Sequence, residues 1–251
     1  MDTDSPIEQL PAIHTSKLNP QDFSRRHDLG DKYGFEKAKV RLFRPDQQDI
    51  LPLVRLRDDP HAREKMPELA DMNDEDLIKW AAHYMDRRTK RMPEMSFAIC
   101  NKQDIPQNIV YLYETNASHI DTAVEREFLP VSSKNSRVIE ISFGKDPISN
   151  EKGLVSSGVR QVLLKVQEMA QVRAKSTGDA AEIAVVAFTK HNPESDRVLE
   201  RSGFILKGNM DYESGETEED KNNKFYVLDW NKLQEIFFQK SSENLLADRQ
   251  P

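Results

Sequence analysis

The segment Lys145–Gly153 has the residue types of a turn that could bind an anion. A strand is expected to end just before it, and an amphipathic helix is predicted to follow over Gly158–Arg173. Free backbone N–H groups and the helix dipole at such a helix start favour a phosphate or pyrophosphate. Gly153 would let a bulky anion approach the backbone, and Lys152 adds a mobile positive charge. A single glycine is a weak motif, so the alternative that Gly153 only makes the turn stays open.

Glu140 is the second residue whose position suggests chemistry. It interrupts the otherwise apolar stretch Val138–Phe143, which is expected to form a strand. Burial of such a carboxylate would raise its pKa toward neutrality and suit it to accept a proton. Two other interpretations remain: Glu140 faces solvent on a half-exposed strand, or it pairs with an arginine or lysine.

A third feature is the run His191–Phe204, which contains the signals for a short helix and a following strand. Asn192 can cap the helix, and Pro193 fits its first position, where a missing N–H costs nothing. Gly203 suits the left-handed helix ending, and Phe204 opens a strand. The same features occur in many well-capped helices, so this run gains meaning only from its context.

Composition sets broader limits. The chain has 251 residues, of which 37% are hydrophobic and 31% charged, and its net charge of -7 argues against a nucleic-acid partner bound through a basic face. Cys100 is the single cysteine, which excludes an internal disulfide and a cysteine-based zinc cluster, and the six histidines lack metal-ligand spacing. With no apolar run near eighteen residues and no hydrophobic signal core, no membrane span is expected and the cytoplasm is the expected location.

The apolar periodicity predicts the order of the elements. Strands are expected at 38–43, 96–100, 109–113, 138–143, 182–188, 204–208 and 223–230. Helices are expected at 47–58, from 74 to about 85, at 158–173 and from 193 to about 202, whereas 116–136 is expected to be a long loop. A hairpin together with β-α-β units indicates one mixed α/β sheet, in which the strands before and after the third helix are parallel. Residues 1–36 and the tail after about 240 show no sustained periodicity.

From these elements, the run from Val138 to Gly208 resembles the GNAT family, the GCN5-related N-acetyltransferases. The matching segments are IEISFGKDP, NEKGLVSSGVRQVLLKV, EIAVVAF and HNPESDRVLERSGFILKG, with VRLFRPDQQDILPLVRLRDDP and WAAHYMDRR as the family's first strand and first two helices. The similarity extends over about residues 38–230. Within the family it is greatest to ribosomal-protein N-terminal acetylases and small-molecule acetylases such as spermidine acetylases.

This resemblance implies a fold of the α/β (α+β) class. The sheet would have about seven mostly antiparallel strands with a central, splayed parallel pair and about four flanking helices. The acetyltransferase domain would occupy 37–232, between a flexible arm at 1–36 and a helix end with a polar tail at 233–251. The implied reaction transfers an acetyl group from acetyl-CoA, without a metal, to a primary amine of a small molecule, a polyamine or a peptide N-terminus. The resemblance implies a cytoplasmic monomer or homodimer with neither nucleic acid nor membrane as partner.

The resemblance also implies roles for particular residues. Glu140 would act as the base, directly or through water, while backbone N–H groups at Ser142 and Phe143 would bind the pantetheine arm and polarise the thioester carbonyl. Residues at the family's remaining coenzyme-binding positions are Asn150, Lys152, Gly153, Leu154 and Val155 in the turn, and Asn192 and Ser195 in the last helix. The acidic run Asp211–Asp220 would border the acceptor pocket and favour a cationic acceptor, or it is simply a solvated loop.

Three positions depart from the family's pattern. The turn keeps its middle glycine, but Asn150 replaces a glutamine or arginine and Val155 replaces a glycine or alanine. Leu199 stands where many members carry a tyrosine that protonates the leaving thiolate, although the subgroup named above often lacks it. The alternative function is therefore a GNAT-shaped binding or regulatory module without catalysis.

Overall fold

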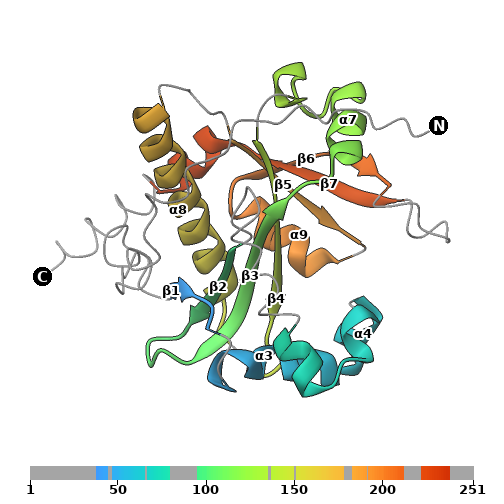
Figure 1. The fold of residues 1–251 in the computed structure, drawn as a ribbon, viewed down its shortest axis with the longest axis vertical. Helices are drawn as coiled ribbons and strands as arrows, with labels where there is room; N and C mark the ends of the chain where they lie inside the picture. The colour runs from blue at the N-terminus through green and yellow to red at the C-terminus, as the bar shows by residue number, and fades with distance from the viewer. Residues whose placement is uncertain are drawn as a thin grey trace, which may run out of the picture.

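The computed structural model describes residues 38–44, 47–65, 67–79, 95–134, 137–149, 151–177, 183–190, 192–211 and 222–237. A seven-stranded sheet runs through these residues in the order β1-β2-β3-β4-β5-β7-β6 (Figure 1). The strands are β1 Lys39–Leu42, β2 Met95–Cys100, β3 Pro106–Glu114, β4 Arg137–Lys145, β5 Ile183–Thr189, β6 Phe204–Met210 and β7 Asn223–Leu228. Only β4 and β5 pair in parallel among these strands.

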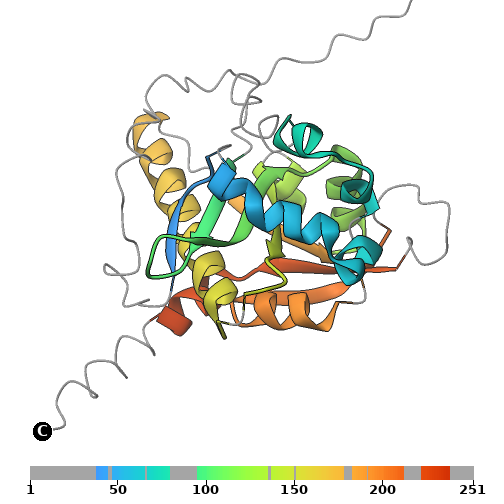
Figure 2. The same cartoon turned by 90° about the horizontal axis from the view of Figure 1, so that it is seen from below.

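Helices cover both faces of the sheet, as the two perpendicular views show (Figures 1 and 2). The helices α8 and α9 lie against one face, while α3, α5 and α7 pack on the other. Their bounds are α3 Gln47–Asp58, α4 Pro60–Lys65, α5 Pro67–Ala70, α7 Ala117–Glu125, α8 Leu154–Thr177 and α9 Pro193–Glu200, with a 3₁₀ turn η3 at Val131–Lys134. Residues 74–79 and 230–237 are also helical.

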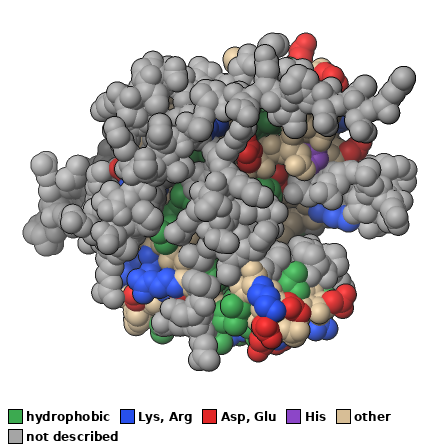
Figure 3. All heavy atoms as spheres, viewed as in Figure 1, with side chains coloured by type: hydrophobic (Ala, Val, Ile, Leu, Met, Phe, Trp, Pro, Cys, Tyr) green, Lys and Arg blue, Asp and Glu red, His purple; other side chains and the backbone are tan. Residues whose placement is uncertain are grey.

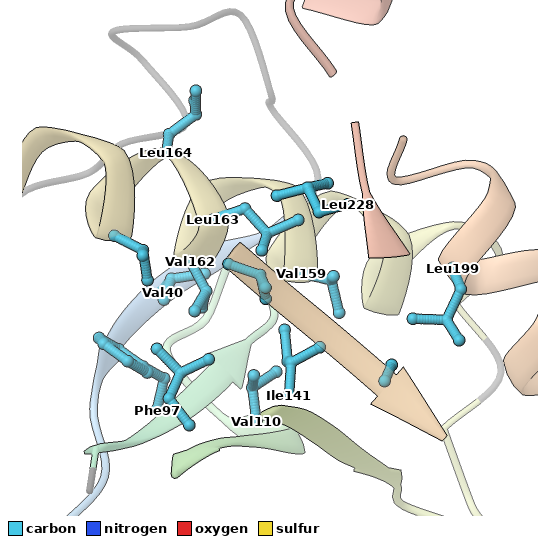
Figure 4. Close-up of a cluster of buried hydrophobic side chains, with 14 of the residues drawn as sticks. Val40, Phe97, Val110, Ile141, Val159, Val162, Leu163, Leu164, Leu199 and Leu228 are labelled. Atoms are coloured by element: carbon cyan, nitrogen blue, oxygen red, sulfur yellow. The ribbon is translucent and has the colours of Figure 1, made fainter. Parts of the chain in front are cut away.

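The largest hydrophobic core lies between α8 and the sheet (Figure 4). One stripe of α8, including Val159, Val162 and Leu163, packs onto side chains of the central strands such as Val110 and Ile141. All five are at most 1% exposed. This packing places α8 against β1, β2 and β3, and the turn after β4 leads into the start of the helix.

Gly158 shows how closely α8 approaches the sheet. A Cβ atom at this position would lie 2.3 Å from Cδ1 of Ile99 on β2. The glycine is therefore required by the approach of the helix to the strand, and not by backbone conformation.

The surface over α3 and α4 carries side chains of both signs (Figure 3). Arg57 of α3 pairs with Asp58 at 2.8 Å and with Asp74 at 2.5 Å. The carboxylates hold the pKa of Arg57 above its usual value, chiefly through the hydrogen bond to Asp58. Arg41 and the fully buried Asp49 make a second ion pair, at 2.5 Å, which ties β1 to α3.

The sheet, its single parallel pair and the hairpin of β2 and β3 confirm the expected architecture. Asp104 in the hairpin turn has a φ of 64°, a left-handed conformation that aspartate tolerates better than most residues. The structure has more helices than the roughly four expected, because α4, α5 and α7 were not foreseen.

The expected long loop at 116–136 is wrong. It contains α7 and the turn η3, and Ala123 of α7 and Leu129 between them pack in one core with Val186 of β5 and Phe225 of β7. Neighbouring antiparallel strands need only a two-residue turn, so this connection between β3 and β4 is a true insertion. The helix was missed although Ile120, Ala123 and Val124 follow helical spacing, because it has only 9 residues and its N-cap, Asn116, makes no side-chain capping bond.

The helix α3 ends at Asp58, as expected, but Pro60 opens a further helix, α4, which Asp59 caps by accepting a hydrogen bond from the N–H of Ala62 at 2.8 Å. Two other boundaries differ from expectation. Trp230 is not in the last strand, which ends at Leu228 before the next helix begins. Most importantly, α8 begins at Leu154, one turn earlier than expected.

The predicted arm at 1–36 and the tail after 240 lie outside the described residues, as does the acidic run after Asp211. The helix at 230–237 packs Leu233 and Phe237 into the main core. None of the helices in the described part of the chain is long and apolar enough to cross a bilayer.

Candidate active site

The central feature of the site is the point where β4 and β5 separate. Their parallel pairing covers only Arg137 to Glu140 on β4 and Ile183 to Val186 on β5. Beyond it, β4 remains paired with β3 as far as Lys145, and β5 pairs with β7 as far as Thr189. Beyond Glu140, β4 is therefore held by β3 and β5 is held by β7, while the N–H and C=O groups that β4 and β5 direct toward each other are no longer paired. These groups can bind an extended ligand that lies between the strands.

Glu140 lies at the last paired position, opposite Val186. Its side chain is 4% exposed, which excludes the interpretation that it faces solvent. Tyr113, its register neighbour on β3, donates a hydrogen bond from its hydroxyl to Oε1 of Glu140. The flanking Ile139 and Ile141 point to the other face, into the core beneath α8. The carboxylate is thus buried, oriented by a phenol and located where the ladder ends.

The next residues of β4 line the separation. Ser142 and Phe143 are both half-buried, and Phe143 packs against the main core. Consecutive residues of a strand direct their N–H groups to opposite edges, so only one of these two amides faces β5. The amide that faces β5 is available for the predicted contact, because the pairing with β5 has already ended, whereas the other amide points to β3, with which β4 remains paired.

The N-terminus of α8 follows the turn after β4. Gly153 has a φ of +82°, and a Cβ atom placed there would meet no heavy atom within 4 Å. Its carbonyl accepts the first helical hydrogen bond, from the N–H of Ser157 at 3.0 Å. The N–H groups of the first helical turn have no partner within the helix, because the residues four positions before them lie outside it. The helix therefore begins with amides that have no partner inside it, beside an open space at Gly153 where an anion can approach the backbone.

The other predicted residues of the turn divide into two groups. Lys152 is exposed, whereas Leu154 and Val155 are 1% and 8% exposed and belong to the main hydrophobic core. The side chain of Val155 thus packs inward beneath α8. Asn150 lies outside the described residues.

The last helix contributes Asn192, whose side-chain oxygen accepts a hydrogen bond from the N–H of Ser195 at 3.3 Å. Asn192 is therefore the expected N-cap, and both side chains are half-buried. Leu199, at the position of the family's tyrosine, is fully buried in the core. It offers no acid to a leaving group.

A polar network that was not predicted anchors α9 to the sheet. Asp196, which is 6% exposed, accepts hydrogen bonds from the hydroxyl of Thr189 on β5 at 2.6 Å and from Nζ of Lys224 on β7 at 2.5 Å. Burial and the charge of Asp196 raise the pKa of Tyr226, which therefore stays neutral. This network fixes α9 next to the end of β5, the strand that borders the separation.

A buried arginine links the two helices behind the sheet. Arg160 of α8 donates a hydrogen bond from Nη1 to the carbonyl of Arg201, at the end of α9, at 2.9 Å. Loss of hydration on burial, followed by the charge of Arg201, lowers the pKa of Arg160 to about 10. The group remains charged at pH 7. No set of three or more His, Cys, Asp or Glu side chains among the described residues could hold a metal ion.

Comparison with known proteins gives a clear result for structure only. No sequence family and no curated protein matches the chain. An uncharacterised protein from Bacillus halodurans matches with a TM-score of 0.56 and 13% identity, over 82% of this chain and 92% of the other. AAC(6′)-Ib, solved with paromomycin and acetyl-CoA, matches with a TM-score of 0.53 and 15% identity, over 78% and 96%.

A third solved structure, FdhC, is described as a nucleotide-linked sugar GNAT. It matches with a TM-score of 0.51 and 14% identity, over 82% of this chain and 94% of the other. These identities are too low to transfer a substrate, but the coverage includes nearly the whole of each neighbour. Taken with the seven-stranded sheet and its separating parallel pair, the matches show that this chain has the fold of the GNAT acetyltransferases.

Proposed function

We propose that this protein is an N-acetyltransferase that transfers an acetyl group from acetyl-CoA to a primary amine. The observation that carries the proposal is the end of the β4–β5 ladder at Glu140, with the N-terminus of α8 at the end of the same β-strand and turn. This arrangement places three groups in sequence from β4 to α8: a buried carboxylate, the unpaired strand amides and the start of a helix. Acetyl transfer from coenzyme A to an amine can use all three: a base for the amine proton, N–H donors for the thioester carbonyl and a helix start for the diphosphate.

In the proposed complex, the diphosphate of the coenzyme binds the amides at the start of α8, beside Gly153 and Lys152. The pantetheine arm then lies between β4 and β5, and a backbone N–H at Ser142 or Phe143 polarises the thioester carbonyl. Asn192 and Ser195, at the start of α9, contact the arm from the side of β5. All of these contacts follow a single extended ligand from the helix start toward Glu140.

The acceptor amine must lose a proton, because a primary amine with a pKa near 10 is almost wholly protonated at pH 7. Glu140 accepts this proton, directly or through a water molecule, while its hydrogen bond from Tyr113 holds the carboxyl group in place. The nitrogen then attacks the carbonyl carbon, a C–N bond forms and the C–S bond breaks, and the second proton of the nitrogen passes to the leaving thiolate, directly or through water, to give the thiol of coenzyme A. The thiolate of coenzyme A leaves without a strong acid, since thiol pKa values lie near 8.5.

The first test is binding. Coenzyme A, titrated calorimetrically into the purified protein, should bind and should raise the melting temperature, because the ligand stabilises only the native state. A panel of primary amines with acetyl-CoA, assayed by thiol release, should then reveal turnover. Protein that binds coenzyme A but acetylates no amine would argue against catalysis, and protein that does not bind coenzyme A would exclude the proposed enzyme and favour the binding or regulatory module.

The second test concerns Glu140. Glu140→Gln keeps the shape of the side chain and removes the base, so kcat/KM should fall roughly 10²–10⁴-fold with little change in coenzyme affinity. Glu114→Gln is the matched control, because Glu114 is an exposed carboxylate on β3, next to Tyr113. Equal activity of the two variants would exclude Glu140 as the base.

A further inference from the structure

Asp146, immediately after β4, organises the turn that leads to α8. It is fully buried. Its N–H donates to the carbonyl of Gln107 at 2.9 Å, and its own carbonyl accepts from the N–H of Ser149 at 2.9 Å. Its side-chain Oδ1 accepts from the N–H of Ile148 at 3.1 Å. The shape of the first half of the turn therefore depends on this one residue.

The remaining carboxylate oxygen of Asp146 binds an arginine from a distant helix. Nη1 of Arg55, in the last turn of α3, lies 2.6 Å from Oδ2 of Asp146. The two residues are 91 positions apart in the chain. The helix is also in close contact with β4, because a Cβ atom at Gly144 would lie 2.8 Å from Cδ1 of Leu56. Arg55 thus connects a helix that rests on the end of β4 to the turn that follows it.

The position of Asp146 creates an electrostatic problem for an anionic ligand. Asp146 precedes Gly153 by seven residues in the same turn, and a buried negative charge there disfavours a diphosphate at the start of α8. Arg55 carries the compensating charge, and its side chain is 35% exposed, so it is the solvent-facing member of the pair. The pair therefore presents no net negative charge to the ligand.

We propose that Arg55 is a positioning residue of the coenzyme site. It neutralises Asp146 and fixes the turn at 146–149, so that the amides at the start of α8 meet the diphosphate in a favourable field. This inference rests on the function proposed above and adds a residue from α3 to the coenzyme site. It predicts that losing Arg55 weakens coenzyme binding through the uncompensated charge of Asp146.

The variants that separate charge from structure are Arg55→Gln, Arg55→Lys, Asp146→Asn and the double variant Arg55→Gln/Asp146→Asn. Asparagine keeps an oxygen for the N–H of Ile148 while removing the charge. Arg57→Gln is the matched control, because Arg57 lies on the same helix and pairs instead with Asp58 and Asp74. The measurement is the Kd of coenzyme A by calorimetry, at low and at high salt.

Arg55→Gln should raise the Kd about tenfold or more, with the larger effect at low salt, whereas Arg57→Gln should leave it unchanged. Arg55→Lys should recover most of the affinity, and the double variant should bind more tightly than Arg55→Gln alone. Equal Kd values for Arg55→Gln and Arg57→Gln would overturn the inference. A double variant no better than Arg55→Gln would overturn the charge-compensation argument.

A second readout needs no coenzyme. Amide hydrogen exchange at Ile148 and Ser149 should accelerate in Arg55→Gln and stay unchanged in Arg57→Gln, because the first variant releases the side chain that holds the turn. Unchanged exchange in Arg55→Gln would contradict the positioning role. Wild-type protein that fails to bind coenzyme A would instead overturn the proposed function, so the two failures are distinguishable.

Discussion

Gly153 is the position where the coenzyme hypothesis makes its sharpest prediction. Gly153→Ala adds one methyl group to a residue with φ +82°, and nothing lies within 4 Å of that methyl. The left-handed backbone then costs about 1–2 kcal/mol, offset by about 0.4–1 kcal/mol from the reduced entropy of the unfolded chain. The net loss of stability should therefore be roughly 1 kcal/mol, or about 2–4 °C in melting temperature.

Coenzyme binding should suffer more than stability does. The added methyl projects into the open space where the diphosphate would approach the backbone, and it should prevent at least one hydrogen bond from an amide to a charged oxygen. Such a bond contributes about 1.5–3 kcal/mol, which corresponds to an increase of roughly 10–100-fold in Kd. Calorimetry with coenzyme A measures this directly, at a temperature at which both proteins are folded.

Gly203→Ala is the matched control. Gly203 also has a positive φ, of +93°, but a Cβ atom there would lie 3.0 Å from the backbone N and Cα of Leu233. This variant should lose about 1–3 kcal/mol more than Gly153→Ala through overpacking, yet bind coenzyme A with wild-type affinity because Gly203 follows the far end of α9. If Gly153→Ala bound coenzyme A as tightly as Gly203→Ala, the idea of a diphosphate at the start of α8 would be refuted.

Three further outcomes follow from the packing. Asp196→Ala should lower the free energy of unfolding by about 1–3 kcal/mol, because it leaves the buried hydroxyl of Thr189 without its acceptor, while the half-exposed Lys224 can be hydrated instead. Glu194→Ala, on the exposed side of α9, should change the stability little. Urea unfolding would measure both variants, and equal losses would contradict the anchoring role of Asp196. Burial raises the pKa of the Cys100 thiol to about 12, so the native protein should resist alkylation at pH 8, and labelling should be limited by the rate of unfolding. The free energy of unfolding should also fall as the pH rises above about 9, because only the thiol of the unfolded chain ionises there. Rapid labelling of the native thiol would argue against its burial. Gly158→Ala should lower the free energy of unfolding by about 1–3 kcal/mol through its clash with Ile99. Because Ile99→Ala removes the clashing atoms, the double variant should lose less stability than the sum of the two single variants, as measured by thermal unfolding. Additive losses would show that the two residues are not in contact.

Local sequence signals predicted the elements around β5 well. Both ends of α9 carry residues typical of helix boundaries. Asn192 caps the start by accepting a hydrogen bond from the N–H of Ser195, and Gly203, with a positive φ, follows the end. Neighbouring residues alone produce these features, so they can be predicted from the sequence without knowledge of the fold. The parallel pairing of β4 and β5 was also predictable, because a crossover helix leaves little other choice.

The missed features depend on contacts between distant parts of the chain. The pairs Arg55–Asp146 and Asp196–Lys224 join elements that no local pattern connects, and in the sequence each of these residues resembles an ordinary surface charge. The burial of Glu140 was among the possibilities, but its partner Tyr113 was not, because the phenol comes from a neighbouring strand. Sequence therefore identified the carboxylate and the turn, while the residues that position them required the structure.

The placement of Val155 changes how the departures from the family's turn should be weighed. In a helix start that binds an anion, the backbone amides are the ligands, so a side chain matters only if it projects toward the anion. Val155 instead packs into the core at 8% exposure, and its β-branched bulk fills space beneath α8. Gly153 is the position where a side chain would enter the open space, and this glycine is retained. Loss of the small residue at position 155 therefore does not by itself argue against coenzyme binding, and the variants at Gly153 and Arg55 become the decisive tests.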